Sequence, residues 1–258
     1  MMVAKMEIKL KLRRFVVVAC GVIGAVIWLV LNPESYEEAF IPVANTGAES
    51  GIVDENGTWQ ELGDVDESAP LASGVLERLE VKGRAPKTGY KREEFYNDWP
   101  SVEGCSLRQR IIKREFGDSA VLDGCNVIAG EYDEPYTGQH LVFTERSQIS
   151  SGVQIDHVVA LSDAWQKGAQ YMEYEVRHAM ATDPLNLLAV DASANSKKSD
   201  GDAATWLPSN KRFRCQYVAR QVSVKYKYGL WITSAEKEAI SGVLNSCPEQ
   251  RSIGVTLE

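Results

Sequence analysis

The residues best suited to chemistry are Asp156 and His157, followed along the chain by Asn186 and Asn195. Hydrolysis of a phosphodiester needs a cation that offsets developing charge and a base that takes a proton from water. A histidine with a pKa of about 6.5 can be that base. A carboxylate and an amide oxygen can hold a hard cation such as Mg²⁺. The residue types and spacing therefore predict His157 as the general base, with Asp156 and Asn195 as metal ligands.

The adjacency of Asp156 and His157 sets a geometric condition on this prediction. Both lie in a short β-branched run, 153–159, that is typical of a strand. Because neighbouring residues of a regular strand point to opposite faces, the pair can share one site only if the strand ends or bulges there. A lone Asp-His pair is more often structural, and a lone Asn is more often a turn or cap residue. The order and spacing of the four residues together favour the catalytic interpretation.

This pattern resembles the HNH, or ββα-metal, nucleases, including the HNH domain of the RNA-guided CRISPR nucleases. Asp-His-Val-Val at 156–159 is followed by Asn186 and then by Asn195 with Lys and Asp after it. A longer resemblance, over about residues 89–248, is to secreted actinobacterial HNH endonucleases of the DUF1524 group. The stretches that carry it are GYKREEF (89–95), PYTG (135–138), QIDHVVAL (154–161), AWQKGA (164–169), DPLNLLAVD (183–191) and GDAATWLP (201–208).

The resemblance implies a role for each motif residue. Asp156 binds the metal, His157 activates water, Asn186 braces the loop that orients His157, and Asn195 completes the metal site. Asparagine rather than histidine at the third motif position favours hard, oxygen-bound metals over zinc. We therefore expect Mg²⁺, with Mn²⁺ or Ca²⁺ as alternatives. Lys198, close to Asn195, is expected to act near the scissile phosphate.

Two positions depart from the family pattern. Ser199 stands where the family usually has glycine in a Lys-Gly-Asp sequence, and Glu134 stands where it usually has aspartate. Ser199 is expected to tighten or redirect the turn after the metal helix. Neither departure touches the four motif residues.

The basic residues are concentrated in one part of the chain. The net charge of -8 arises largely before the folded part, because no Lys or Arg occurs between Arg14 and Arg78. From Lys197 to Lys227 there are eight basic residues and two acidic ones. Such a face suits a phosphate backbone, with DNA favoured over RNA, although a solvated helix surface is the alternative. The residues expected to bind nucleic acid are Lys197, Lys211, Arg212, Arg214 and Arg220.

The N-terminal part has the pattern of an exported protein. The apolar run FVVVACGVIGAVIWLVL, residues 15–31, follows a basic stretch, 1–14. Its 17 residues would span roughly 25 Å as a helix, which is short for a hydrocarbon core of about 30 Å. We favour a transmembrane anchor, with a cleavable signal segment as the alternative. The positive-inside rule leaves 1–14 in the cytoplasm, so the protein is expected at the cell membrane with its catalytic domain outside, or secreted after cleavage.

Four cysteines follow the apolar run, and an even number in an oxidising compartment indicates two disulfides. Of the three possible pairings, we favour the local one, Cys105 with Cys125 and Cys215 with Cys247. A zinc site is the alternative, but the sequence lacks a C-x-x-C pair and a nearby histidine at ligand spacing.

The remaining organisation is an acidic linker, 32–70, expected to be disordered, and a nuclease domain, 71–258. The domain is expected to be α+β and mostly helical around a ββα-metal core. Strands are predicted at 127–129, 141–143, 153–159 and 185–190. Helices are predicted at 71–81, 106–116, 160–180 with a break near Gly168, 194–199, 210–228 and 233–244.

The sequence thus predicts a metal-dependent HNH endonuclease acting outside the cytoplasm. A non-catalytic cell-surface binding module that keeps the HNH fold is the alternative, and the complete set of motif residues argues against it. A hydrolase that uses the same residues on another substrate also remains open.

Overall fold

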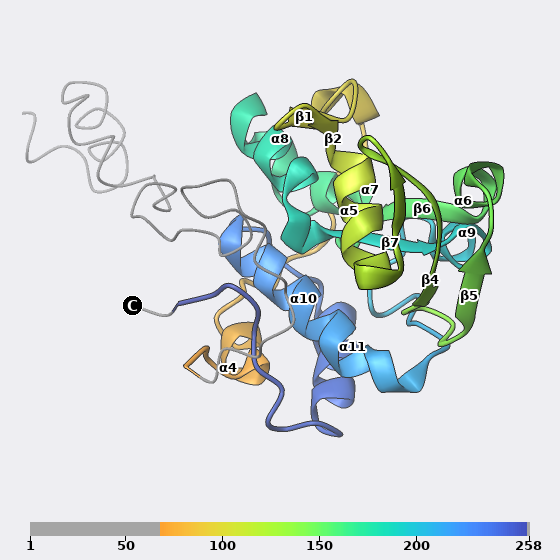
Figure 1. Cartoon of the computed structure of the whole chain (residues 1–258). Coiled ribbons are helices and arrows are strands. Elements are labelled where there is room, and N and C mark those ends of the chain that lie inside the picture. Colours follow the sequence, from red (N-terminus) through yellow and green to blue (C-terminus); the bar gives the residue numbers. More distant parts are fainter. Residues whose placement is uncertain (1–67, 257–258) are drawn as a thin grey trace, which may run out of the picture. The chain divides into compact units, whose positions relative to one another are not determined.

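The computed structural model describes residues 68–256, where helices surround three small antiparallel sheets (Figure 1). This mixed architecture confirms the expected combination of helices and strands. The predictions for 1–14, 15–31 and nearly all of 32–70 fall outside the described residues. Within 68–256, no helix combines the length and apolar character that crossing a membrane requires.

The central element is a hairpin of β6 (Val153–His157) and β7 (Leu187–Asp191). Its register pairs Asp156 with Leu188 and His157 with Leu187. Helix α9 (Ala192–Lys198) follows at once, because the Asp191 side chain accepts a hydrogen bond from the Ala194 N–H and caps the first turn. Strand, strand and helix therefore occur in the predicted order.

The two faces of this hairpin are covered by different helices. Side chains alternate along β6 and β7, so Val153, Leu187 and Ala189 share one face and pack on α5 (Leu107–Phe116). Leu188 and Val190 share the other face and pack toward α9 and the C-terminal helices. Figure 1 shows α5 lying along β7. Both faces of the hairpin are therefore covered over most of their length, with Gln154 exposed.

A second sheet packs beside α5, in the strand order β3 (Val121–Asp123), β4 (Asn126–Asp133) and β5 (His140–Phe143). Gly130 of β4 has φ +146°, and a Cβ there would lie 2.7 Å from the Phe116 ring. The close approach of α5 to this sheet therefore requires glycine. Strand β4 is longer than the predicted segment, 127–129. The short strands β1 (Ser101–Val102) and β2 (Cys105–Ser106) and helix α6 (Arg146–Gly152) complete this region.

The predicted helical segment 160–180 is divided near Gly168, as expected. Helix α7 (Leu161–Gln166) is followed by the 3₁₀ turn η3 (Ala169–Tyr171) and by α8 (Tyr174–Thr182). Gly168 has φ +126°, a conformation that glycine adopts without strain. A further turn, η4 (Pro184–Asn186), leads into β7.

The C-terminal helices form the rest of the core. Helix α10 (Arg214–Lys227) packs on α11 (Ser234–Leu244) and on α4 (Ala72–Leu76). The 3₁₀ turns η5 (Lys211–Phe213), η1 (Arg92–Glu94) and η2 (Gly117–Ser119) lie in connecting segments. Helix α4 is shorter than the predicted 71–81, and α10 begins a few residues after the predicted start.

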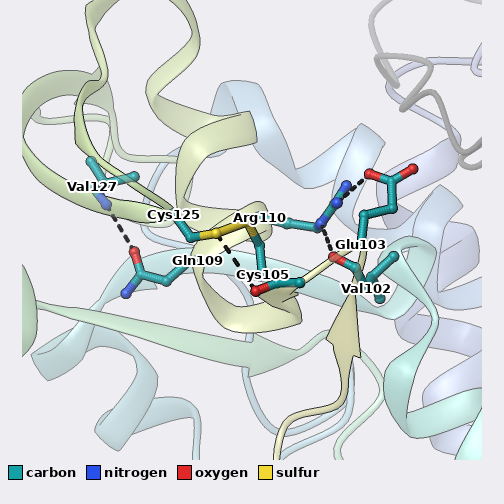
Figure 2. The surroundings of a disulfide bond; sticks show 8 residues. Val102, Glu103, Cys105, Gln109, Arg110, Cys125 and Val127 are labelled. Carbon is teal, nitrogen blue, oxygen red and sulfur yellow. Dashed lines mark hydrogen bonds and ion pairs between the residues drawn. A yellow bond between two sulfur atoms is a disulfide. The ribbon is translucent and has the colours of Figure 1, made fainter.

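The two expected disulfides are present. Cys105 bonds Cys125 and Cys215 bonds Cys247, with Cα–Cα distances of 5.4 and 6.4 Å. Figure 2 shows the first bond at the start of α5, where the Gln109 side chain accepts a hydrogen bond from the Val127 N–H. All four cysteines are therefore engaged, which excludes the zinc alternative for them.

We predict that the full chain carrying Cys20→Ser has no titratable thiol in denaturant without reductant. The bonded cysteines are 20 and 32 residues apart, so the chain-entropy model gives roughly 3–4 kcal/mol of stabilisation for each bond. Urea denaturation of Cys105→Ser/Cys125→Ser, compared with its parent, measures the loss. Two or more free thiols in the Cys20→Ser protein would contradict the pairing.

Candidate active site

His157 is the last residue of β6, and its side chain is only 6% exposed. Its Nε2 lies 2.9 Å from the carbonyl oxygen of Ala181. Because a carbonyl can only accept, Nε2 carries the proton and Nδ1 carries the lone pair. No residue among 68–256 provides a hydrogen-bond partner for Nδ1. This tautomer is the one a general base needs, with its proton acceptor free.

The surroundings of His157 keep the imidazole neutral. Burial lowers its pKa to about 3, and the positive charges of Arg92 and Lys198 act in the same direction. The ring therefore carries no charge at any pH near neutrality in the free protein. An anion beside the ring would oppose the two positive charges and raise this pKa.

Two aromatic side chains fix the plane of the imidazole. The Trp99 ring is stacked on it, with ring centroids 5.9 Å apart and an interplanar angle of 9°. The Tyr96 ring lies 5.8 Å away, and Arg92 both covers the Tyr96 ring and donates a hydrogen bond to its hydroxyl. Sequence analysis missed these contacts. Only Arg92 lies in a stretch that carries the family resemblance.

Asn186 holds the chain that follows His157. Its Oδ1 accepts a 2.8 Å hydrogen bond from the Val159 N–H, and its Nδ2 donates to the Met180 carbonyl at 3.3 Å. Its own carbonyl accepts from the Val158 N–H at 2.8 Å. The side chain is completely buried. Asn186 thus lies where a residue bracing the His157 loop must lie.

Asp156 projects from the opposite face of β6. Its Oδ1 is 2.9 Å from the Lys198 ammonium, and its Oδ2 accepts a hydrogen bond from the Tyr136 hydroxyl. Lys198 also donates to the His157 carbonyl at 2.8 Å. Burial raises the pKa of Asp156, while the Lys198 charge and the Tyr136 hydrogen bond lower it. The structure therefore brings Asp156 and Lys198 together, and Tyr136 is a partner that sequence analysis did not identify.

The strand does not bulge between Asp156 and His157. The register is regular from Val153 to His157, and the backbone pairing continues with Val158 and Asn186. The two side chains consequently leave the strand on opposite faces. The strand ends immediately after His157, but its pairing stays regular up to that end, so Asp156 and His157 do not share a face. Lys198 connects the two positions through the Asp156 carboxylate and the His157 carbonyl.

Asn195 lies on α9, beside β6. Its Nδ2 donates to the Gln154 side chain at 2.9 Å, which leaves its Oδ1 without a partner among residues 68–256. A carboxylate has about four acceptor positions, and Asp156 uses two of them. In donor type, Asp156 and Asn195 fit a hard cation that keeps several waters. Within 68–256 there is no group of three His, Cys, Asp or Glu residues that could hold a metal, so a site here depends on amide oxygen and water as well as on Asp156.

The expected basic helix face needs correction. Helix α10 is buried over most of its length, because it packs between the β6–β7 hairpin, α4 and α11. Arg220 is 3% exposed and donates to the Leu185 carbonyl, and Lys225 is paired with acidic residues in the core. Arg214 is half-buried and donates to the Pro208 carbonyl. The exposed members of the predicted set are Lys197, Lys211 and Arg212.

Comparison with known proteins identifies the family. The model of the C-terminal domain of GmrSD restriction endonucleases matches residues 107–243. An uncharacterized secreted protein of Arthroderma benhamiae is 35% identical over 184 residues, which cover 70% of this chain and 86% of that protein. No solved structure gives a match. The chain belongs to the GmrSD C-terminal domain family, and this membership supports a nuclease function.

The family match covers some residues of the candidate site and not others. It runs from the start of α5 into α11, so it includes Asp156, His157 and Asn195. The residues that cover the imidazole, Tyr96 and Trp99, precede it. The two aromatic rings that pack on His157 therefore come from a segment outside the family match, whereas Ala181 and Lys198 lie within it.

We predict that the ring resonances of His157 do not move between pH 8 and pH 5, because its pKa is lowered to about 3. His140 provides the internal contrast, since its exposed ring is bonded to Asp133 and its pKa is raised. NMR titration of the folded protein measures both. His157→Gln assigns the resonance, and a His157 midpoint near 6.5 would contradict the burial of this ring.

The lowered pKa of His157 also determines how the stability of the protein changes with pH. The folded-state pKa of His157 lies below that of the unfolded chain, so acid protonates the unfolded state first. The contribution of His157 to stability is present above pH ~6.5 and is lost as the pH falls toward ~3. Urea denaturation at pH 7 and pH 5 should show a smaller loss in His157→Gln than in the parent.

Proposed function

We propose that this protein is an HNH-type endonuclease that hydrolyses phosphodiester bonds of nucleic acid, DNA in preference to RNA. Family membership supports the nuclease class. The observation that carries the assignment of the base is the His157 tautomer, whose Nε2 proton is directed to Ala181 and whose Nδ1 is free. In this proposal Nδ1 takes the proton of the attacking water as the water oxygen bonds to phosphorus and the leaving oxygen departs.

The protein controls the basicity and orientation of this imidazole. Ala181 fixes the ring by accepting its Nε2 proton, and Trp99 fixes the ring plane. Arg92 and Lys198 lower the pKa of His157 in the free protein. A phosphate group beside the ring offsets these charges, so His157 becomes a stronger base when substrate is bound.

A divalent cation is part of the same proposal. Asp156 and Asn195 would hold it, with Mg²⁺ expected and Mn²⁺ or Ca²⁺ as alternatives. When bound, such an ion offsets negative charge on the phosphate and on the leaving oxygen. Lys198 keeps one Asp156 oxygen occupied in the free protein. It contributes a positive charge next to the scissile phosphate.

We also propose that the domain acts outside the cytoplasm. Two disulfides are typical of oxidising compartments, and the Arthroderma benhamiae relative is named a secreted protein. The apolar segment 15–31 would either anchor the chain in the membrane or be removed.

Three variants separate the proposed roles in the site. His157→Ala should lose about 10²–10⁴-fold in cleavage rate and retain divalent-ion binding, because only the base is removed. Asp156→Asn should lose both, while it keeps a hydrogen-bonding group beside Tyr136 and Lys198. Asn195→Ala should show a milder loss of both that excess metal partly restores. Plasmid nicking and calorimetry with Mg²⁺, Mn²⁺ and Ca²⁺ provide the measurements.

His178→Ala is the matched control, because His178 is a partly exposed histidine of α8 whose ring packs against Tyr174. It should cleave at the parental rate. Melting curves verify that each variant is folded. If His157→Ala cleaves at the parental rate, or loses metal as completely as Asp156→Asn, His157 is not the base.

The substrate is tested by incubating the purified full chain with plasmid, linear DNA and RNA. Cleavage of plasmid and linear DNA at a higher rate than RNA is expected. Faster cleavage of RNA would reverse the proposed preference. Absence of cleavage on all three with every ion would instead favour the non-catalytic binding module.

A further inference from the structure

A cavity of about 830 Å³ lies beside the candidate active site. It is bounded by the loop that contains Pro135 and Thr137, by Leu188 of β7 and by the region from η5 into α10. Leu188 is paired with Asp156 across the hairpin. Tyr136, between Pro135 and Thr137, is bonded to Asp156. The cavity is therefore linked to Asp156 through Leu188 and Tyr136, although none of Asp156, His157, Asn195 and Lys198 lines it.

Arg220 lines this cavity as a buried cation that makes no contact ion pair with a carboxylate of residues 68–256. Its Nη1 donates to the Leu185 carbonyl at 3.0 Å, but its Nε is buried and has no hydrogen-bond partner. No carboxylate of residues 68–256 lies within ion-pair distance of its guanidinium. Burial lowers its pKa to about 10, so the group remains charged at neutral pH. A buried charge without a partner is costly, and an anionic ligand would remove that cost.

Two further cations line the cavity with free side chains. Lys211 and Arg212 of η5 are exposed, and neither side chain has an ion pair within the described part of the chain. Next to them, Asn210 lines the cavity and caps η5 by accepting from the Arg212 N–H. The rim thus offers two exposed positive charges above a buried one.

The carboxylates of the cavity already have partners. Glu115 is paired with the adjacent arginine, and Asp133 is bonded to His140 at 2.9 Å. Glu134 is completely buried and accepts hydrogen bonds from three backbone N–H groups. Each of the three carboxylates that line the cavity is thus held by a neighbouring side chain or by N–H donors, which partly offsets its negative charge.

We propose that this cavity binds a phosphate group, with Arg220 at its floor and Lys211 and Arg212 at its rim. Guanidinium groups present directed N–H donors that suit phosphate oxygens. The phosphate chemistry follows from the cavity itself. The identification of this phosphate as one in the nucleic-acid strand, flanking the bond to be cut, rests on the proposed function. The cavity then acts as a subsite that aligns the strand, since Leu188 and Tyr136 connect it to Asp156.

The test compares phosphate binding by full-chain variants in EDTA, so that no cleavage occurs. The probes are inorganic phosphate and a 5′-phosphorylated oligothymidylate of six nucleotides, measured by calorimetry. Lys211→Gln/Arg212→Gln should weaken both interactions at least fivefold, and Arg220→Gln should abolish phosphate binding. For the oligonucleotide, the slope of log K against log salt should fall by about 0.7 for each phosphate interaction that the substitutions remove.

Arg78→Gln is the matched control, because Arg78 is exposed and does not line the cavity. It should bind both probes as the parent does. Melting curves show whether Arg220→Gln, which alters a buried position, is folded. If Arg220→Gln is not folded, the test relies on phosphate binding by the double variant at the exposed residues Lys211 and Arg212. Unchanged phosphate binding in that double variant overturns the site.

The two probes also separate the possible sources of the phosphate. Loss of inorganic phosphate binding with unchanged oligonucleotide binding overturns the assignment to a nucleic-acid strand. Weakened binding of both probes supports the subsite. If the parent binds both probes through these residues yet cleaves no nucleic acid with any divalent ion, the phosphate site stands and the proposed nuclease function fails.

Discussion

The arrangement of the candidate site depends on the buried ion pair between Lys198 and Asp156. Two charges removed from water are stabilising only when their remaining hydrogen bonds are satisfied. Here Asp156 also accepts from Tyr136, and Lys198 also donates to the His157 carbonyl. These four groups connect α9, β6 and the loop before β5. The ion pair therefore fixes where the strand ends, and with it the position of the proposed base.

A second set of buried charges fixes the helices around that strand. Lys167 lies within 2.8 Å of acidic oxygens of Asp163, Asp202 and Glu236, and Lys225 pairs with Asp163 and Glu236. Asp202 follows α9 closely, so this network holds the chain just beyond Lys198. It joins α7, α10 and α11. Residues of the GDAATWLP and AWQKGA stretches thus contribute to the scaffold.

The sequence predicted the elements whose patterns are local. The order of strand, strand and helix, the break at Gly168 and the two disulfides all follow from short stretches of residues. The prediction that the basic helix presents a charged surface was wrong, because a count of charges does not say which residues face the core. Arg220 is buried with most of α10 inside the protein. The contacts of Trp99 with His157 and of Tyr136 with Asp156 were missed, since each joins positions far apart in the chain and leaves no local pattern.

Strand alternation gives the two faces of β6 different roles in the site. The His157 side chain leaves β6 toward Trp99 and Ala181, whereas Asp156 leaves it toward Lys198 and Tyr136. One face therefore orients the His157 imidazole, and the other brings together charged and oxygen-bearing groups. The Lys198 ammonium bridges the two by bonding the His157 carbonyl. A cation bound to Asp156 would compete with the Lys198 ammonium for that carboxylate, and Lys198 also bonds the His157 carbonyl, so both faces of β6 depend on the same side chain.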